Sequence, residues 1–247
     1  AAARAARGVG VGKMLGQVAD DDLKAWRDRR LDATSRGTVL RDMALLSAVF
    51  ETARREWKWI ATNPLRDVRK PSKPPHRKRV ITGREIRHML RALGYTRGPV
   101  RSVSQAVAVA FLLALAAGMR AGEVCGPRWE DVRAAYGTAH NVKAREKGVS
   151  RDVPFSPVAR RIVERMRGWD DVLVFGVSAA TLDALFRRAR KRAGLDGFVF
   201  HDARHTAATR MAQRLHLLDL CLAFGWSNIN QAKTYYNATA AQIAGRL

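Results

Sequence analysis

The chain has 247 residues, of which 45 are Lys or Arg and 22 are Asp or Glu, so its formal net charge is +23. Because 47% of the residues are hydrophobic and the basic ones are spread along the chain, the composition excludes a disordered basic tail. It predicts a folded protein whose basic surface attracts a polyanion, usually nucleic acid. The longest apolar stretch, Ala106 to Met119, is shorter than the roughly 20 residues of a membrane-spanning helix, so we expect no membrane partner.

The two cysteines, Cys125 and Cys221, have neither the spacing of a metal site nor that of a disulfide framework. Two cysteines without such spacing are typical of small, buried, hydrophobic side chains in a protein of a reducing compartment. No signal peptide is visible. We therefore expect a cytoplasmic protein with one large or two modest domains.

Helical periodicity dominates the N-terminal part, after an extension over residues 1–19 that has no clear pattern. From Asp20 to Ile60 apolar residues recur at three- and four-residue steps. Ser35 can cap the second helix of this stretch, and Asn63-Pro64 ends the helical run. We therefore expect a helical domain over residues 20–65.

Basic side chains are numerous on these helices and on the segment after them. Any one of them is ordinarily a solvated position, but as a group they suit contact with a DNA backbone. Residues 66–80 contain Lys70-Pro71-Ser72-Lys73-Pro74-Pro75, which cannot be helical and should form an extended linker across a phosphate backbone. The DNA-contacting residues that we expect are Arg36, Arg41, Lys70, Lys73, Arg77 and Arg79.

The helical pattern resumes after the linker. Thr82, with Glu85 three residues later, has the spacing of a capping box at a helix start. The apolar segment 106–117 indicates a buried helix that ends at Gly118, a favoured residue just past a helix end.

A small sheet is expected beyond these helices. Residues 138–142 and 150–155 alternate like two short strands around a turn that contains Gly148, and residues 172–175 suggest another strand. Residues 179–193 then have the pattern of an amphipathic helix. The predicted fold class is therefore mainly α with a small antiparallel sheet (α+β).

Several side chains capable of phosphate chemistry occur together in the C-terminal segment. His201 and Arg204 are three residues apart, so on a helix they share one face. A guanidinium suits paired contacts with phosphate oxygens. Tyr235 can form a covalent phosphoryl intermediate if its charge is held, and Trp226 adds an indole N–H donor. The combination indicates phosphodiester chemistry.

Three motifs resemble those of the tyrosine recombinases, the phage integrase family. Gly118-Met119-Arg120-Ala121-Gly122-Glu123 is similar to the family's first arginine motif, and His201-x-x-Arg204-His205-Thr206 is similar to its second box. Gly225-Trp226, with Tyr235 nine residues after the tryptophan, is similar to the third. The resemblance implies a helical core-binding domain over residues 20–65 and, after the linker, a catalytic domain with a C-terminal tail over residues 81–247.

The function that this resemblance implies is site-specific recombination, in which DNA is cut and rejoined through a 3′-phosphotyrosine. Tyr235 would attack a DNA phosphorus and leave a free 5′-hydroxyl. Arg120 and Arg204 would hold the charge on the non-bridging oxygens, an electrostatic contribution that is usually the largest in such catalysis.

Other residues are given supporting roles by the same resemblance. Glu123 would orient Arg120, with an ordinary surface carboxylate as the alternative. His201 would transfer protons at the nucleophile, whereas His205 would buttress the site. Trp226 cannot accept a proton, so it would position the phosphate, with core packing as the alternative.

Two of these assignments have rivals in the sequence. Tyr236 directly follows Tyr235, and the spacing to Trp226 favours Tyr235 as the nucleophile. For the proton of the leaving 5′-oxygen the family uses a lysine in the hairpin turn. Here Lys147 lies nearest the turn glycine, and Lys143 on the incoming strand is the alternative.

The partners implied by the resemblance are double-stranded DNA and a homo-tetramer assembled on it, with the tail Ala238–Leu247 docking on a neighbouring protomer. The source would be bacterial or phage, with the protein associated with the nucleoid. The sequence has no Gly-rich nucleotide loop, carboxylate cluster or metal-ligand set, so we expect no cofactor, metal or nucleotide.

Alternative functions remain open at this point. A DNA-binding relative whose catalysis has decayed is favoured by the open choice between Lys147 and Lys143 and by Pro127. This proline should end the Arg120 helix early, and it is not usual in the family. A type IB topoisomerase shares the tyrosine chemistry. A plain transcription regulator is the weakest alternative.

Overall fold

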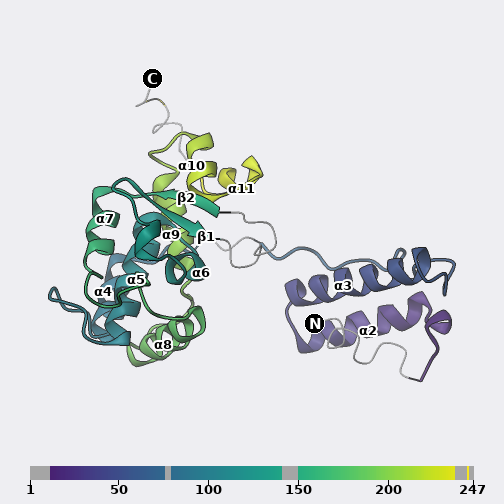
Figure 1. Ribbon diagram of the computed structural model, residues 1–247. Helices are drawn as coiled ribbons and strands as arrows, with labels where there is room; N and C mark the ends of the chain where they lie inside the picture. Colours follow the sequence, from purple (N-terminus) through teal and green to yellow (C-terminus); the bar gives the residue numbers. More distant parts are fainter. Residues whose placement is uncertain (1–11, 76–78, 141–149, 237–243, 245–247) are drawn as a thin grey trace. The chain divides into compact units, whose positions relative to one another are not determined.

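The computed structural model describes residues 12–75, 79–140, 150–236 and 244, and the chain divides into two compact units, Ala1–His76 and Arg77–Leu247. The described parts are helical apart from one two-stranded antiparallel sheet, as the sequence predicts (Figure 1). The elements are, in chain order, η1 (Leu15–Gln17), α2 (Asp20–Ala33), α3 (Arg36–Arg55), α4 (Gly83–Ala92), α5 (Val103–Ala117), α6 (Ala121–Cys125), η2 (Trp129–Asp131), β1 (Tyr136–His140), β2 (Ser150–Pro154), α7 (Pro157–Glu164), α8 (Ala179–Arg192), α9 (Asp202–Met211), α10 (Leu217–Phe224) and α11 (Ile229–Lys233). None of the helices in these ranges is long and apolar enough to cross a membrane.

The first unit is a pair of packed helices, α2 and α3. Ser35 caps α3 as predicted, since its hydroxyl accepts a hydrogen bond of 3.3 Å from the backbone N–H of Thr38. The apolar faces of the two helices bury Trp26 and Phe50 among other side chains. Helix α3 ends at Arg55, before the predicted end of the helical pattern at residue 60. Lys58 adopts a φ of 57°, which a continued right-handed helix does not allow.

The first part of the predicted linker packs within the first unit. Val68 is buried in its core. Arg27 donates a hydrogen bond of 2.9 Å to the carbonyl of Arg69, and Arg36 donates one of 3.1 Å to the hydroxyl of Ser72. These contacts explain why the first compact unit extends through the proline-rich stretch to His76.

Helix α5 is the centre of the second unit, where it contacts α6, α7, α8 and α9 (Figure 1). It is apolar all round, and residues 106–111 are buried without exception, which is the pattern of a core helix. Helix α5 ends as predicted, because Gly118 adopts the left-handed conformation with a φ of 67°. Helix α4 also begins as predicted, with Thr82 and Glu85 forming the capping box.

Strands β1 and β2 form the predicted hairpin, with Tyr136 opposite Pro154 and His140 opposite Ser150, although β1 begins two residues before the predicted start at residue 138. The turn that connects them, and with it Lys143 and Lys147, lies outside the described residues. Residues 172–175 do not form a full strand. They contribute an isolated bridge between Leu173 and Arg128.

The two cysteines are free thiols. Cys125 is buried as expected, and burial raises the pKa of its thiol to about 12. Cys221 is half-buried on α10.

Candidate active site

Arg120 lies immediately before α6, shortly after the left-handed residue Gly118. Its backbone N–H donates to the carboxylate of Glu123 at 2.8 Å, and its Nη1 donates to the other carboxylate oxygen at 2.7 Å. Glu123 therefore holds both the backbone and the guanidinium of Arg120. The Arg120 side chain is 45% exposed, so an anion from solvent can reach it.

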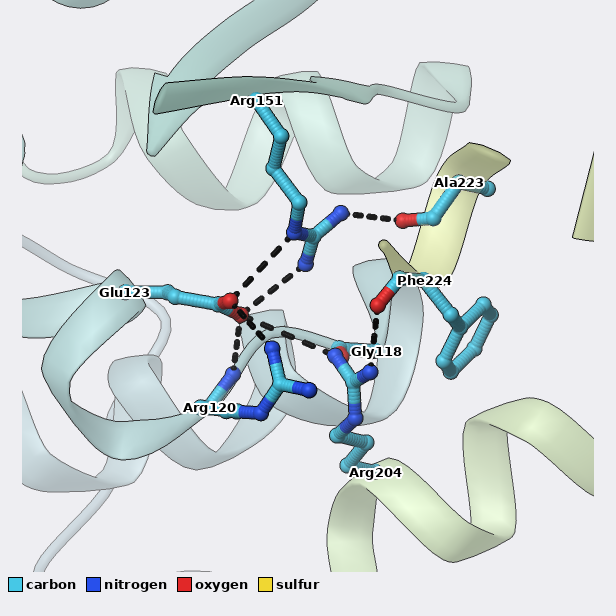
Figure 2. A network of polar contacts seen from close by, with 7 residues as sticks. All are labelled: Gly118, Arg120, Glu123, Arg151, Arg204, Ala223 and Phe224. Atoms are coloured by element: carbon cyan, nitrogen blue, oxygen red, sulfur yellow. Dashed lines mark hydrogen bonds and ion pairs between the residues drawn. The ribbon is translucent and has the colours of Figure 1, made fainter. Parts of the chain in front are cut away.

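Arg204 projects from α9 into the interior and is only 5% exposed. It donates hydrogen bonds to the carbonyls of Gly118, at 2.7 Å, and Phe224, at 2.6 Å, and lies 3.6 Å from Glu123 (Figure 2). Burial and the nearby charge of Arg120 lower the pKa of Arg204 to about 9. The guanidinium is still charged at neutral pH.

A third guanidinium, that of Arg151 on β2, enters the same cluster (Figure 2). It donates to both oxygens of Glu123, at 3.3 and 2.9 Å, and to the carbonyl of Ala223. Burial by itself raises the pKa of Glu123, but Arg151 and Arg120 outweigh it and bring the pKa to about 2. Glu123 is therefore a carboxylate at neutral pH.

Tyr235 follows α11 and is half-buried in a row of aromatic rings. Its ring stacks on Trp226, with centroids 5.1 Å apart and planes within 6°, and Trp226 in turn stacks on Phe224 at 4.7 Å. Arg204 lies over the rings of both Phe224 and Trp226, with its Cζ atom 4.8 and 5.7 Å from their centroids. The aromatic row thus joins the tyrosine to the guanidinium cluster.

The hydroxyl of Tyr235 shares a hydrogen bond of 2.5 Å with Nδ1 of His205. His201, at the N-cap of α9, is edge-on to His205, with ring centroids 4.9 Å apart. Burial raises the pKa of Tyr235, although the charge of Arg204 opposes the change. Burial, and secondarily the electrostatic influence of His205, lower the pKa of His201. The phenol is therefore protonated at neutral pH, and the hydrogen bond joins its hydroxyl to an imidazole nitrogen.

Taken together, these groups suit the binding of an anion beside a nucleophile. The cluster holds three guanidiniums and one carboxylate, a net charge of two positive units (3 − 1 = 2). In such a partly buried place, positive charge acts more strongly on an anion than it does in water. Among the described residues, no group of His, Cys, Asp and Glu side chains could hold a metal ion.

Comparison with known proteins identifies the family. The model of the phage integrase family matches residues 79–242, which is 164 of the 247 residues (242 − 79 + 1). The chain belongs to the phage integrase family. The predicted fold class is confirmed by the similarity to a solved structure, a lambda integrase (75–356) dimer bound to a COC′ core site. That structure has a TM-score of 0.78 and 19% identity, and the match covers 97% of this chain and 87% of that one.

A relative and a second solved structure of lambda integrase are also similar over most of the chain. The Shufflon-specific DNA recombinase of Escherichia coli is 31% identical over 243 residues; the match covers 94% of this chain, which spans only 61% of that relative's length. A lambda integrase tetramer bound to a Holliday junction has a TM-score of 0.73 and 19% identity over 93% of this chain and 71% of that one.

The site brings together most residues that the three motifs predicted. Arg120 and Arg204 both pair with Glu123, and Trp226, Tyr235 and His205 form the adjoining stack. The described hydrogen bond of the Tyr235 hydroxyl joins it to His205, whereas the sequence assigned proton transfer there to His201. Helix α6 ends at Cys125, two residues before Pro127, as predicted.

Arg151 is a member of the site that the sequence analysis missed. It lies 28 residues from Glu123 along the chain and outside the three motifs. The only signal in the sequence was a basic residue that follows the predicted hairpin turn by three positions, at the second residue of the outgoing strand.

The expected DNA-contacting residues lie in several places. Arg36, Arg41, Lys70 and Lys73 are exposed in the first unit. Arg77 lies outside the described residues.

Arg79 belongs to the second unit and is held within it. Its guanidinium pairs with Glu85 and lies 5.5 Å from the ring centroid of Phe198. Its charge is therefore already engaged by a carboxylate of the same unit.

Proposed function

We propose that the protein is a site-specific DNA recombinase that cuts and rejoins DNA through a 3′-phosphotyrosine formed on Tyr235. The observation that carries the proposal is a tyrosine joined by stacked rings to a cluster of three guanidiniums, with an imidazole on its hydroxyl. Family membership and the names of the relatives support the same activity. We propose Glu123 as the residue that orients Arg120.

In the cleavage step the Tyr235 oxygen forms a bond with phosphorus while the bond from phosphorus to the 5′-oxygen breaks. Arg120 and Arg204 hold the charge that grows on the non-bridging oxygens, and Trp226 can donate its indole N–H to one of them. Because the phosphotyrosine conserves the energy of the broken bond, attack by a 5′-hydroxyl of another strand rejoins the DNA without a nucleotide cofactor.

Two protons must move in this step. We propose that the phenol proton passes to His205, because the hydrogen bond of 2.5 Å already joins the two groups, and that His201 supports that imidazole through ring contact. The departing 5′-oxygen takes a proton from a lysine of the hairpin turn. We propose Lys147 for this role, with Lys143 as its rival.

We propose double-stranded DNA as the partner and a tetramer as the assembly that exchanges strands. The net charge of +23 supports a polyanionic partner, and lambda integrase has been solved on a core site and as a tetramer on a Holliday junction. In this proposal residues 20–65 form the core-binding domain, residues 66–80 the linker and residues 81–247 the catalytic domain. The tail Ala238–Leu247 docks on a neighbour, and the protein acts at the nucleoid of a bacterial cell.

A nicked suicide duplex tests the activity directly. Duplexes tiled across the DNA that flanks the gene are nicked close to each candidate cleavage point, so that the short cleaved strand is lost and religation is blocked. We expect a covalent protein–DNA adduct on one of them, resistant to denaturant. Tight binding without an adduct would favour a DNA-binding relative with decayed catalysis. Relaxation of supercoiled DNA without strand exchange would favour a topoisomerase.

A further inference from the structure

Arg151 is the one guanidinium of the cluster that the proposed reaction does not yet use. Three of its nitrogen atoms carry described hydrogen bonds, two to Glu123 and one to the carbonyl of Ala223 (Figure 2). Its side chain is 16% exposed, against 45% for Arg120. It therefore contacts the carboxylate and the backbone, and it is less open to solvent than Arg120 is.

The contacts of Arg151 join three separate segments of the second unit. It belongs to β2, the strand that follows the turn carrying Lys147. Glu123 belongs to α6, and Ala223 lies near the end of α10, three residues before Trp226. One side chain thus links β2 to α6, the helix that begins next to Arg120. It also links β2 to the end of α10, from which the chain continues to Tyr235.

The backbone near Ala223 is shaped to admit this side chain. Gly225 adopts a φ of 60°, and a Cβ atom at this position would lie 2.7 Å from Cδ of Arg151. That distance is too short for a real contact, so a larger residue would push the guanidinium away from its acceptors. The glycine therefore serves both the end of α10 and the approach of Arg151.

We propose that Arg151 is a positioning residue for DNA cleavage. It keeps Glu123 against Arg120 and Arg204, and it fixes β2 to the end of α10, which precedes Trp226 and Tyr235. This inference rests on the proposed function. It assigns Arg151 no contact with the substrate. One effect of Arg151 is to fix the geometry of Arg120 and Arg204. The other is to keep Glu123 ionised, because Arg151 makes the largest contribution that opposes the effect of burial on the pKa of that carboxyl group.

A pH dependence separates this role from a general contribution to folding. The charged groups that face Glu123 are Arg120 at the start of α6, Arg151 on β2 and Arg204 on α9. Without the charge of Arg151, the pKa of Glu123 rises, since burial is then opposed less. Glu123 becomes protonated at a higher pH, and it releases Arg120 there. Cleavage by the variant should therefore fail on acidification sooner than cleavage by the wild type.

The experiment measures single-turnover cleavage at saturating DNA against pH, on the nicked duplex with which the wild-type chain forms an adduct. Arg151→Met keeps the apolar stem and removes the charge. We expect a roughly 10- to 100-fold lower rate at neutral pH with nearly unchanged DNA affinity, as is usual for loss of a supporting contact. We also expect the cleavage rate of Arg151→Met to fall at a higher pH on acidification than the wild-type rate does. The double variant Arg151→Met/Glu123→Gln should not show this additional fall, because a glutamine side chain at that position cannot be protonated.

Two further variants sharpen the test. Arg151→Lys keeps the charge but cannot make the paired contact, so we expect the pH profile of the wild type with only partial recovery of the rate. Arg165→Met is the matched control. Arg165 is another partly buried arginine, which donates to the hydroxyl of Tyr95 at 2.7 Å and to the carbonyl of Gly98 at 2.8 Å. We expect it to lower stability without moving the pH profile.

A wild-type rate and pH profile in Arg151→Met would overturn the inference while leaving the proposed function intact. So would a loss confined to DNA affinity, or a loss of rate that Arg165→Met matches at equal thermal stability. If the wild-type chain itself forms no adduct, the proposed function fails first, and the inference fails with it.

Discussion

At the scale of single residues, the site depends on how two imidazoles and one phenol are arranged. His205 is in direct hydrogen-bonding contact with Tyr235, whereas His201 contacts the ring of His205. Burial raises the pKa of Tyr235, so removal of its proton is a necessary part of attack at neutral pH. The group that takes this proton should dominate the cleavage rate.

We therefore predict that His205→Asn slows cleavage more than His201→Asn does, with a loss of at least ~100-fold for His205, the scale of general acid–base catalysis. Single-turnover rates at saturating DNA measure this directly. His216 at the start of α10 provides a matched control, because its described hydrogen bond is a local one that its ring accepts from the backbone of Leu218. A larger loss in His201→Asn would return the proton-transfer role to the residue that the motif alone assigns to it.

How far a residue could be predicted depended on how far its contacts reach along the chain. Arg120 and Glu123 are three residues apart, as are His201 and Arg204, so local helical geometry and motif spacing predicted them. Arg151 meets Glu123 across 28 residues and Ala223 across 72, and no local pattern encodes such a contact. The partner of the Tyr235 hydroxyl depends on how the turn after α11 packs, which spacing alone does not determine.

At the scale of elements, the turn between α5 and α6 positions Arg120. Gly118 has a φ of 67°, and a Cβ there would lie 2.5 Å from two ring atoms of Phe224. Its carbonyl also accepts a hydrogen bond from Arg204. The glycine therefore allows α5, α9 and the end of α10 to meet. The sequence predicted its helix-ending role but not its contact with the aromatic ring, because that contact spans two distant segments.

We predict that Gly118→Ala lowers the free energy of unfolding by about 3 kcal/mol, from the left-handed conformation and from overlap with Phe224 together. Chemical denaturation measures this. Gly94→Ala is the matched control, because Gly94 has a φ of 71° but no atom within 4 Å of its Cβ position, so only about 1 kcal/mol should be lost. Equal losses in the two variants would show that Phe224 exerts no constraint.

The hairpin is the second element with a testable role. Its strands β1 and β2 were predicted from alternation, and its turn carries the proposed general acid. A substrate with a 5′-phosphorothiolate has a leaving group that needs no proton. We predict that Lys147→Ala loses cleavage on the ordinary duplex and recovers it on the sulfur-containing one. Recovery in Lys143→Ala instead would move the general acid to the incoming strand.

At the scale of the whole molecule, the charge distribution predicts that both units contribute to DNA binding. Lys70 and Lys73 lie exposed on the proline-rich stretch of the first unit. Each phosphate contact contributes about −0.9 to the slope of log affinity against log salt concentration for B-form DNA. The proline-rich stretch in the sequence predicted that the chain has two units. The packing of residues 66–75 on the first unit was not predicted, because it depends on buried contacts such as that of Val68.

We predict that the double variant Lys70→Ala/Lys73→Ala flattens this salt slope by about 1.8 units, or about 0.9 for each contact. Affinity measured over a range of salt concentrations gives the slope. Arg167→Ala is the control, since its guanidinium lies 3.9 Å over the ring of Trp129 and pairs with Glu164. An unchanged slope in the double variant would exclude these lysines from the DNA contact.

The most direct measurement is the identity of the residue that carries the DNA in the covalent adduct. After proteolysis of the adduct and digestion of its DNA, mass spectrometry should find the remaining nucleotide on Tyr235. Tyr235→Phe should form no adduct while it binds duplex DNA nearly as well as the wild type, because only one oxygen is lost. An adduct that persists in Tyr235→Phe, or one that maps to Tyr236, would contradict the account.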